Sequence, residues 1–157
     1  MDVVITYVDG NDPLWKSDYA KYSDTPVLEK RFRDWGTLKY LLRGIEKHMH
    51  FVQNVFLVVS HESQVPQWVD KTAVRVVLHK DFIPQELLPT FNCNPIEMHL
   101  HNIEGLGEEY IYISMMTCSR LQIQDLRISI EMARECWDSA DICLHVVCSS
   151  RSAAILT

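Results

Sequence analysis

Apolar runs of five to seven residues recur along the first 113 residues of the chain, separated by longer polar segments. The runs are rich in β-branched and aromatic side chains, a composition typical of β-strands. They span residues 3–8, 54–60, 74–78 and 109–113. The runs are continuous rather than strictly alternating, which predicts strands buried on both faces, as in a mostly parallel sheet flanked by helices.

The segments between the predicted strands differ in character. A helix of about 15 residues is expected after Asp34, because its apolar residues recur at helical spacing. These apolar residues are Leu38, Leu41, Leu42 and Ile45. Residues 96–101 also read as helical, whereas residues 9–24 read as a polar loop and residues 65–69 as a short connecting turn or helix.

Polar side chains follow three of the predicted strands directly. Asp9 and Asp12 follow the first strand, Ser60 and His61 the second, and His79 and Asp81 the third. In an open α/β sheet, ligands bind at the carboxyl ends of the strands, so this placement is typical of a nucleotide-sugar or dinucleotide site. The alternative for Asp9 and Asp12 is an acidic surface turn without a ligand.

Composition narrows the class of protein. With 157 residues, 47% of them hydrophobic, a single globular domain is expected. A net charge of −6 without a basic run argues against nucleic acid as a partner. No apolar stretch is long enough for a transmembrane segment, and the N-terminus lacks the pattern of a signal peptide. Five cysteines without CxxC spacing indicate neither a zinc site nor a disulfide framework, which favours the reducing cytoplasm.

Two clusters of polar residues are candidates for chemistry. The first consists of basic side chains and one aspartate around the start of the predicted helix, namely Arg31, Arg33, Asp34, Lys39 and Arg43. Arginine binds phosphate bidentately, and the glycine-rich phosphate loops GxGxxG and GxxxxGK[ST] are absent from the chain. The alternative is a solvated charged face, with the basic side chains paired by Asp34 and Glu46.

The second cluster lies within ten residues and comprises Asn92, Asn94, Glu97, His99 and His101. On one helix, Glu97 and His101 would share a face at i, i+4. Such a pair can bind a metal, or its carboxylate can orient the histidine for acid–base chemistry. The spacing is not HExxH, so a zinc protease is not expected.

These motifs together resemble the Stealth protein family. Residues 7–13, Tyr-Val-Asp-Gly-Asn-Asp-Pro, are similar to its first conserved region, although Tyr7 stands where tryptophan is usual. Residues 31–34, Arg-Phe-Arg-Asp, and 38–47 resemble the start of the second region, which continues to residues 110–112. The match covers residues 1–113, which we expect to form the donor-binding part. Its implied fold is a Rossmannoid α/β sheet like that of nucleotide-sugar transferases, incomplete in this chain.

The resemblance implies transfer of a sugar-1-phosphate from a nucleotide-sugar donor, such as a UDP-sugar, to an acceptor hydroxyl in capsular or exopolysaccharide synthesis. The partners would then be that donor and a polysaccharide or glycan acceptor, in the bacterial cytoplasm or at the inner face of the membrane. A divalent metal, Mg or Mn, would act as cofactor.

The resemblance also implies roles for particular residues. Those near the transferred phosphate would be Asn94, Glu97, His99 and His101. Those serving the donor would be Asp9, Asp12, Arg31, Arg33, Asp34, Arg43 and Asn92. The metal ligands are not identified.

The resemblance stops at residue 114. The family continues with Asn-Asp-Asp-Met-Phe, whereas residues 115–119 read Met-Met-Thr-Cys-Ser. The letters AATGATGACATGTTCTC encode the family motif in one frame and Met-Met-Thr-Cys-Ser one base later. The last 50 residues also lack glycine and proline and hold four of the five cysteines. These features suggest a frameshifted tail over residues 114–157, ending early at Thr157, and an impaired enzyme.

Three alternatives remain open. The first alternative is that the tail is not frameshifted but is a divergent C-terminal element, with a helix over residues 121–137 and a strand over residues 142–147. The second alternative is that the protein is a glycosyltransferase that moves the sugar without its phosphate. The third is that it is a nucleotide-sugar-binding remnant without catalysis.

Overall fold

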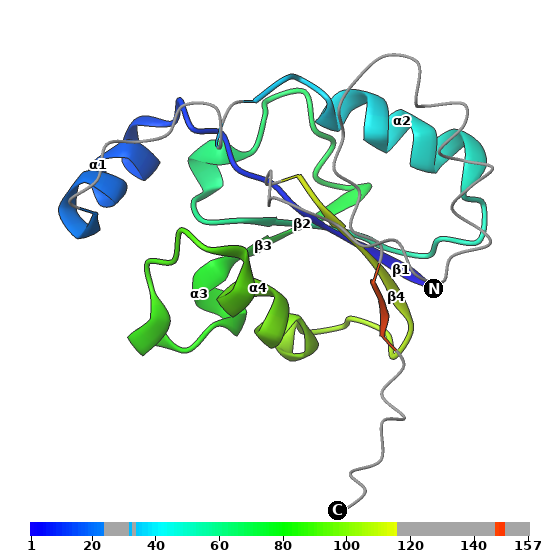
Figure 1. Cartoon of the computed structure of the whole chain (residues 1–157). Coiled ribbons are helices and arrows are strands. Elements are labelled where there is room, and N and C mark those ends of the chain that lie inside the picture. Colours follow the sequence, from blue (N-terminus) through cyan, green and yellow to red (C-terminus); the bar gives the residue numbers. More distant parts are fainter. Residues whose placement is uncertain (24–31, 33, 116–146, 150–157) are drawn as a thin grey trace, which may run out of the picture.

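A mostly parallel β-sheet forms the centre of the molecule and carries helices on both faces (Figure 1). The computed structural model describes residues 1–23, 32, 34–115 and 147–149. The strand order is β3-β2-β1-β4-β5. The strands are β1 (Asp2–Thr6), β2 (Val55–Val59), β3 (Val74–Leu78), β4 (Tyr110–Ser114) and β5 (Val147–Ser149). The first four strands are mutually parallel, as the sequence predicts, and β5 pairs antiparallel with β4.

The central strand β1 separates two apolar layers. Val3 and Ile5 face the layer that contains Leu38 and Ile45, whereas Val4 faces the layer that contains Ile96. Val3, Val4 and Ile5 have no exposed surface, so each contributes about 1.5–3 kcal/mol of burial free energy. The continuous apolar run that predicted a doubly covered strand is thereby explained.

Four α-helices flank this sheet in the described part of the chain: α1 (Pro13–Tyr22), α2 (Leu38–His48), α3 (His79–Phe82) and α4 (Cys93–His99). Helix α2 lies on one face of the sheet, and α3 and α4 lie on the other (Figure 1). Short 3-10 turns span Glu62–Gln64, Gln85–Leu87 and Leu100–Asn102. No helix within the described ranges combines the length and apolar character needed to cross a membrane.

The expected helix after Asp34 is confirmed as α2, although it has 11 residues rather than about 15. Leu38 and Ile45 are buried, and Leu41 and Leu42 pack partly buried against the same layer. The four apolar positions therefore form the face that covers the sheet, as their spacing indicates.

The expectation of a polar loop over residues 9–24 is wrong, because this segment contains helix α1. Asp12 caps the helix and Pro13 is its first residue, a start signal that needs no apolar periodicity. The indole of Trp15 is 2% exposed and lies 4.7 Å from the ring of Phe32 and 5.7 Å from that of Phe91, centroid to centroid. Aromatic packing, rather than an apolar stripe, holds this helix on the molecule.

Helix α4 begins three residues before the expected Ile96, because the side chain of Asn92 caps it by accepting from the amide of Asn94. It ends at His99, where a 3-10 turn begins. Glu97 and His101 are therefore not i, i+4 neighbours on one α-helix, and that part of the expectation is wrong. The fourth strand is confirmed, shifted by one residue to Tyr110–Ser114.

The predicted tail elements fall almost entirely outside the described residues. The proposed helix over 121–137 lies wholly outside them, and of the proposed strand over 142–147 only residue 147 is described, as the start of β5. The expected division of the chain at residue 113 stays a prediction.

Candidate functional site

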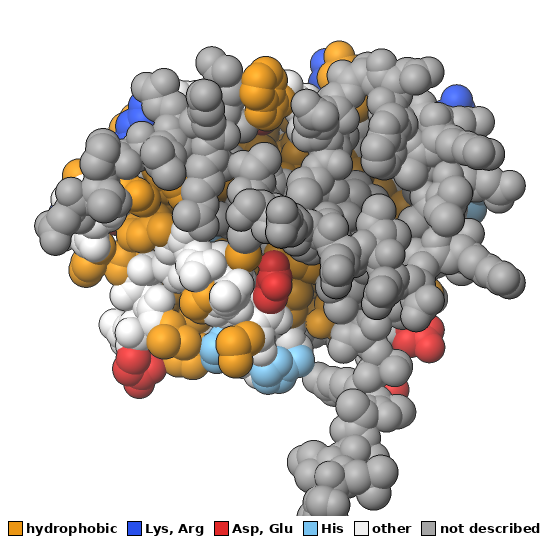
Figure 2. Space-filling model, in the orientation of Figure 1, with side chains coloured by type: hydrophobic (Ala, Val, Ile, Leu, Met, Phe, Trp, Pro, Cys, Tyr) orange, Lys and Arg blue, Asp and Glu red, His pale blue; other side chains and the backbone are white. Residues whose placement is uncertain are grey.

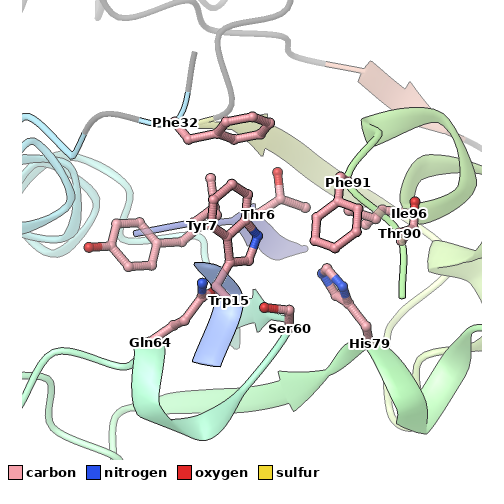
Figure 3. Close-up of a pocket in the computed structure, with 11 residues that line it drawn as sticks. Thr6, Tyr7, Trp15, Phe32, Ser60, Gln64, His79, Thr90, Phe91 and Ile96 are labelled. Atoms are coloured by element: carbon pink, nitrogen blue, oxygen red, sulfur yellow. The ribbon is translucent and has the colours of Figure 1, made fainter. Parts of the chain in front are cut away.

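The carboxyl ends of β1, β2 and β3 meet at one edge of the sheet, since these strands are parallel. A pocket lies at this edge, and its enclosed space of about 10 Å³ holds about one water molecule. We call it the strand-end pocket (Figure 3). It is lined by Thr6, Tyr7, Val8, Trp15, Phe32, Ser60, Gln64, His79, Thr90, Phe91 and Ile96.

The turn after β1 approaches another segment so closely that it requires glycine. The amide of Gly10 donates to the carbonyl of Phe32 at 2.9 Å. A Cβ added at Gly10 would lie 2.4 Å from that carbonyl oxygen, closer than any real contact. The Val-Asp-Gly motif is thus fastened to the segment that precedes α2, and this contact brings Phe32 to the pocket.

Both predicted carboxylates of this turn have partners in the protein. Asp9 Oδ1 accepts from the amide of Asn11 at 2.8 Å. Asp12 Oδ1 accepts from the amide of Trp15 at 2.7 Å, and Asp12 is only 6% exposed. In the described structure Asp12 is the N-cap of α1, whereas Asp9 is half-buried and keeps its second oxygen for other contacts.

The predicted donor residues around α2 do not form one group. Asp34 accepts from the hydroxyl of Tyr7 at 2.9 Å and from the amide of Gly36 at 2.8 Å. Burial and the neighbouring Asp34 carboxylate raise the pKa of Tyr7 far above its ordinary value, so Tyr7 stays protonated and donates. Arg43 is exposed on α2. Arg31 and Arg33 lie outside the described residues.

Ser60, Gln64 and His79 line the strand-end pocket and were not among the residues assigned a role by the family resemblance. Ser60 follows β2, Gln64 ends the next 3-10 turn, and His79 is the first residue of α3 (Figure 3). Ser60 Oγ and Gln64 Oε1 are buried without a hydrogen-bond partner among the described residues. Burial lowers the pKa of His79 to about 4, with a smaller effect from His61. The sequence marked Ser60 and His79 by their position after a strand, but no sequence signal marks Gln64.

The cluster on α4 gives one histidine a defined orientation. Nδ1 of His99 lies 2.7 Å from the carbonyl oxygen of Pro95. A carbonyl only accepts, so Nδ1 carries the proton and Nε2 of the neutral ring is free to accept one. The rings of His99 and His101 stack with their centroids 6.3 Å apart. Figure 2 shows histidine side chains at the surface where Figure 1 places α4.

Glu97 connects α4 to the sheet. The hydroxyl of Tyr112 on β4 donates to Glu97 Oε1 at 3.2 Å, and Thr6 Oγ1 lies 3.2 Å from the same hydroxyl. Since Tyr112 donates its one proton to Glu97, the Thr6 hydroxyl must be the donor of the second bond. Burial raises the pKa of Tyr112 well above its ordinary value, so this series of hydrogen bonds persists at neutral pH.

The described residues do not by themselves form a metal site. They contain no group of three or more His, Cys, Asp or Glu side chains placed to hold an ion. Asp12 is already used as a helix cap. The predicted site therefore divides into the turn after β1 and the polar face of α4. The strand-end pocket touches the start of that turn through Val8 and the buried face of α4 through Ile96.

Comparison with known proteins supplies the family. The family model "Stealth protein CR2, conserved region 2" matches residues 31–130. The receptor polysaccharide phosphotransferase WefC of Streptococcus oralis is 40% identical over 123 residues, covering 73% of this chain and 36% of the relative. The capsular polysaccharide phosphotransferase WcwK of Streptococcus pneumoniae is 37% identical over 123 residues, with the same coverage.

The match extends over a larger share of a third relative. The capsular polysaccharide phosphotransferase eps5J of Streptococcus thermophilus is 37% identical over 140 residues, covering 82% of this chain and 56% of the relative. The chain spans about a third of the length of WefC and WcwK. Because the match to conserved region 2 takes in well over half of its residues, the chain belongs to the Stealth protein family.

Proposed function

We propose that this chain is part of a sugar-1-phosphate transferase of polysaccharide synthesis, and that its donor is a UDP-sugar. The relatives are named polysaccharide phosphotransferases. From these names we infer that the transferred group contains a phosphate. The structural observation that supports it is His99, whose Nδ1–H is held by a backbone carbonyl and whose Nε2 can accept a proton.

In the proposed reaction an acceptor hydroxyl oxygen attacks the phosphorus that carries the sugar. A new phosphate ester bond forms, the anhydride bond to the nucleotide breaks, and the nucleoside monophosphate leaves with the electron pair of that bond. The hydroxyl proton passes to Nε2 of His99, acting as general base. Glu97 and Asn94 would lie beside the transferred phosphate, and His101 would support the ring of His99.

We propose Asp9 and the arginines Arg31 and Arg33 as the principal donor contacts. Asp9 supports this role because it follows the central strand and, among the described residues, only its Oδ1 has a hydrogen-bond partner. We propose further donor contacts from Asp34, Asn92 and Arg43. The cap made by Asp12 argues for an indirect role of that residue, through the placement of α1.

A divalent metal, Mg or Mn, is proposed as a requirement of the complete enzyme, because the described residues do not form a three-ligand site by themselves. Removal of metal with EDTA should abolish transfer, and added Mg or Mn should restore it. Transfer that continues unchanged in EDTA would contradict this requirement. The proposed location is the bacterial cytoplasm, at the inner face of the membrane, where donor and growing glycan meet.

We also propose that a frameshift just before Met115 removed the family's Asn-Asp-Asp motif and impaired this chain. Sequencing the gene across codons 110–120 tests the first part, because the alternative frame there should encode Asn-Asp-Asp-Met-Phe. The second part is tested by assaying this chain and a frame-restored protein with a UDP-sugar donor. We expect turnover only after restoration; equal turnover by both would contradict impairment.

Product analysis tests the reaction itself. Phosphorus NMR of the frame-restored reaction should show a phosphodiester and released nucleoside monophosphate. A phosphate-free glycoside with released nucleoside diphosphate would instead identify a glycosyltransferase. His99→Gln should lower kcat at least about 100-fold, the usual contribution of a general base, whereas His101→Gln is the matched control with the smaller effect.

A further inference from the structure

Helix α2 carries basic side chains on the side that faces away from the sheet. Lys39, Arg43 and Lys47 are exposed and follow one another at intervals of four residues. Side chains at this interval lie on successive turns, so the three form an inclined row along the helix. Leu38 and Ile45 are buried against the sheet, which turns the row outward (Figure 1).

The charge of this segment is opposite to that of the chain. Residues 35–51 hold three basic side chains and one acidic side chain, Glu46, whereas the whole chain has 15 basic and 21 acidic residues. The carboxylate that precedes the segment, Asp34, accepts from the Tyr7 hydroxyl and the Gly36 amide, so each of its oxygens has a partner. The outer side of α2 therefore favours an anionic partner, which the net charge of −6 otherwise repels.

Exposed aromatic side chains accompany the basic row. Tyr40 lies on α2 next to Lys39 and is 68% exposed. Trp35 precedes the helix and is 67% exposed, and Phe51 follows it and is 47% exposed. They are three of the five large aromatic residues that are exposed in the described part of the chain. A single exposed aromatic residue is ordinary, but three around one helix indicate a contact surface.

A lipid surface matches both properties of this segment. Tryptophan and tyrosine concentrate at the level of the lipid headgroups, where their amphipathic rings meet both water and hydrocarbon. Lysine and arginine are attracted to the negative surface potential of anionic lipids. A protein partner fits less well, because lysine is depleted in protein–protein interfaces. The charge and the aromatic residues together therefore favour an anionic membrane.

We propose that the outer side of α2 docks the chain on an anionic membrane surface, with Lys39 and Lys47 at the headgroups and Trp35 and Tyr40 in the interface. The inference rests on the proposed function, which places the reaction at the inner face of the membrane. The apolar side of α2 is already packed on the sheet and does not insert. Docking is therefore shallow and largely electrostatic, and salt should reverse it.

Sedimentation of the full chain with lipid vesicles tests the docking surface. We expect binding to vesicles of phosphatidylglycerol and phosphatidylcholine, little binding to phosphatidylcholine alone, and release by about 0.5 M NaCl. A basic side chain at an anionic surface contributes about fivefold in affinity. Lys39→Gln combined with Lys47→Gln should therefore weaken binding on the order of 20-fold, and Glu46→Gln should strengthen it about fivefold.

Lys16→Gln combined with Lys80→Gln is the matched control. It removes the same two charges from exposed positions on α1 and α3, and it should bind vesicles like the wild type. Because the net charge falls equally in the two double variants, a difference between them locates the surface on α2. Arg43 is left unchanged, since it is also proposed as a donor contact.

Tryptophan fluorescence tests the position of Trp35. Phosphatidylcholine with brominated acyl chains quenches tryptophan on contact, and mixed with phosphatidylglycerol it should quench the fluorescence of the chain. Trp35→Phe should remove most of this quenching, because Trp15 is buried and the interface is occupied by Trp35.

Three results would overturn the docking surface: no preference for anionic vesicles, equal loss of binding in the two double variants, or undiminished quenching in Trp35→Phe. A dimer in analytical ultracentrifugation that Lys39→Gln with Lys47→Gln dissociates would assign this side of α2 to a second copy of the chain instead. Circular dichroism melts check that each variant is folded. Failure of the proposed function is read separately, from the product of the frame-restored enzyme. Vesicle binding together with a phosphate-free product would reject phosphotransfer and leave the docking surface standing.

Discussion

Replacing Asp12 separates its structural role from a direct role in donor binding. Its Oδ1 accepts from the amide of Trp15 at 2.7 Å and caps α1. Loss of an N-cap costs about 0.5–2 kcal/mol. Trp15 is 2% exposed, so water replaces the lost bond poorly, and the upper end, about 2 kcal/mol, is expected for Asp12→Ala. For a chain of this length that corresponds to a Tm lower by about 4–8 °C.

Asp12→Asn is the matched variant, because asparagine caps helices nearly as well as aspartate. Its free energy of unfolding, measured by urea denaturation with circular dichroism, should stay within about 0.5 kcal/mol of the wild type. A variant Asp12→Ala that is as stable as the wild type, or Asp12→Asn as unstable as Asp12→Ala, would refute the capping argument. Weaker nucleotide binding by a stable Asp12→Asn would instead show that the carboxylate charge contacts the donor.

Three further predictions concern the core and the pocket. Gly10→Ala should destabilise the chain by about 2 kcal/mol or more in urea denaturation, because its Cβ would meet Phe32. Gly44→Ala is the control, since a Cβ there has open space and should stabilise α2 slightly. Equal effects of the two substitutions on the free energy of unfolding would contradict the close approach at Gly10. Because the folded-state pKa of His79 is about 4 against 6.5 unfolded, the unfolded state binds the extra proton between these values. Stability is therefore full above pH 6.5 and falls by up to about 3 kcal/mol as the pH drops toward 4, and His79→Gln should remove this part of the pH dependence. Tyr112→Phe should cost about 1 kcal/mol in thermal unfolding through its bonds to Glu97 and Thr6, and no loss would count against that connection.

Local patterns in the sequence predict the sheet because its strands are buried on both faces. The three runs that became β1, β2 and β3 need no knowledge of their partners to be recognised, and their continuous apolar character indicates the parallel pairing that the structure shows. The same holds for α2, whose apolar face alone defines it. Helix α1 has no such face, so the pattern missed it, although Asp12 and Pro13 mark its start.

The candidate site divides in the same way. Sequence singled out Asp9 and the α4 cluster as candidates, because strand ends and dense polar clusters are visible along the chain. It gave no sign that the Glu97 carboxylate is bound by Tyr112, or that Gln64 reaches the turn after β1.

By itself, then, the sequence determined the strands, the amphipathic helix and the family, since each depends on residue types at short or fixed spacing. Only the tertiary structure decided which polar atoms have partners. Gln64 lies 55 residues from Asp9, and the two meet because the parallel sheet brings the ends of β1 and β2 together. Tyr112 lies 15 residues from Glu97, and the two meet because α4 packs on the face of the sheet that contains Tyr112. Hydrogen bonding is decided at about 3 Å, a distance that only the folded backbone sets.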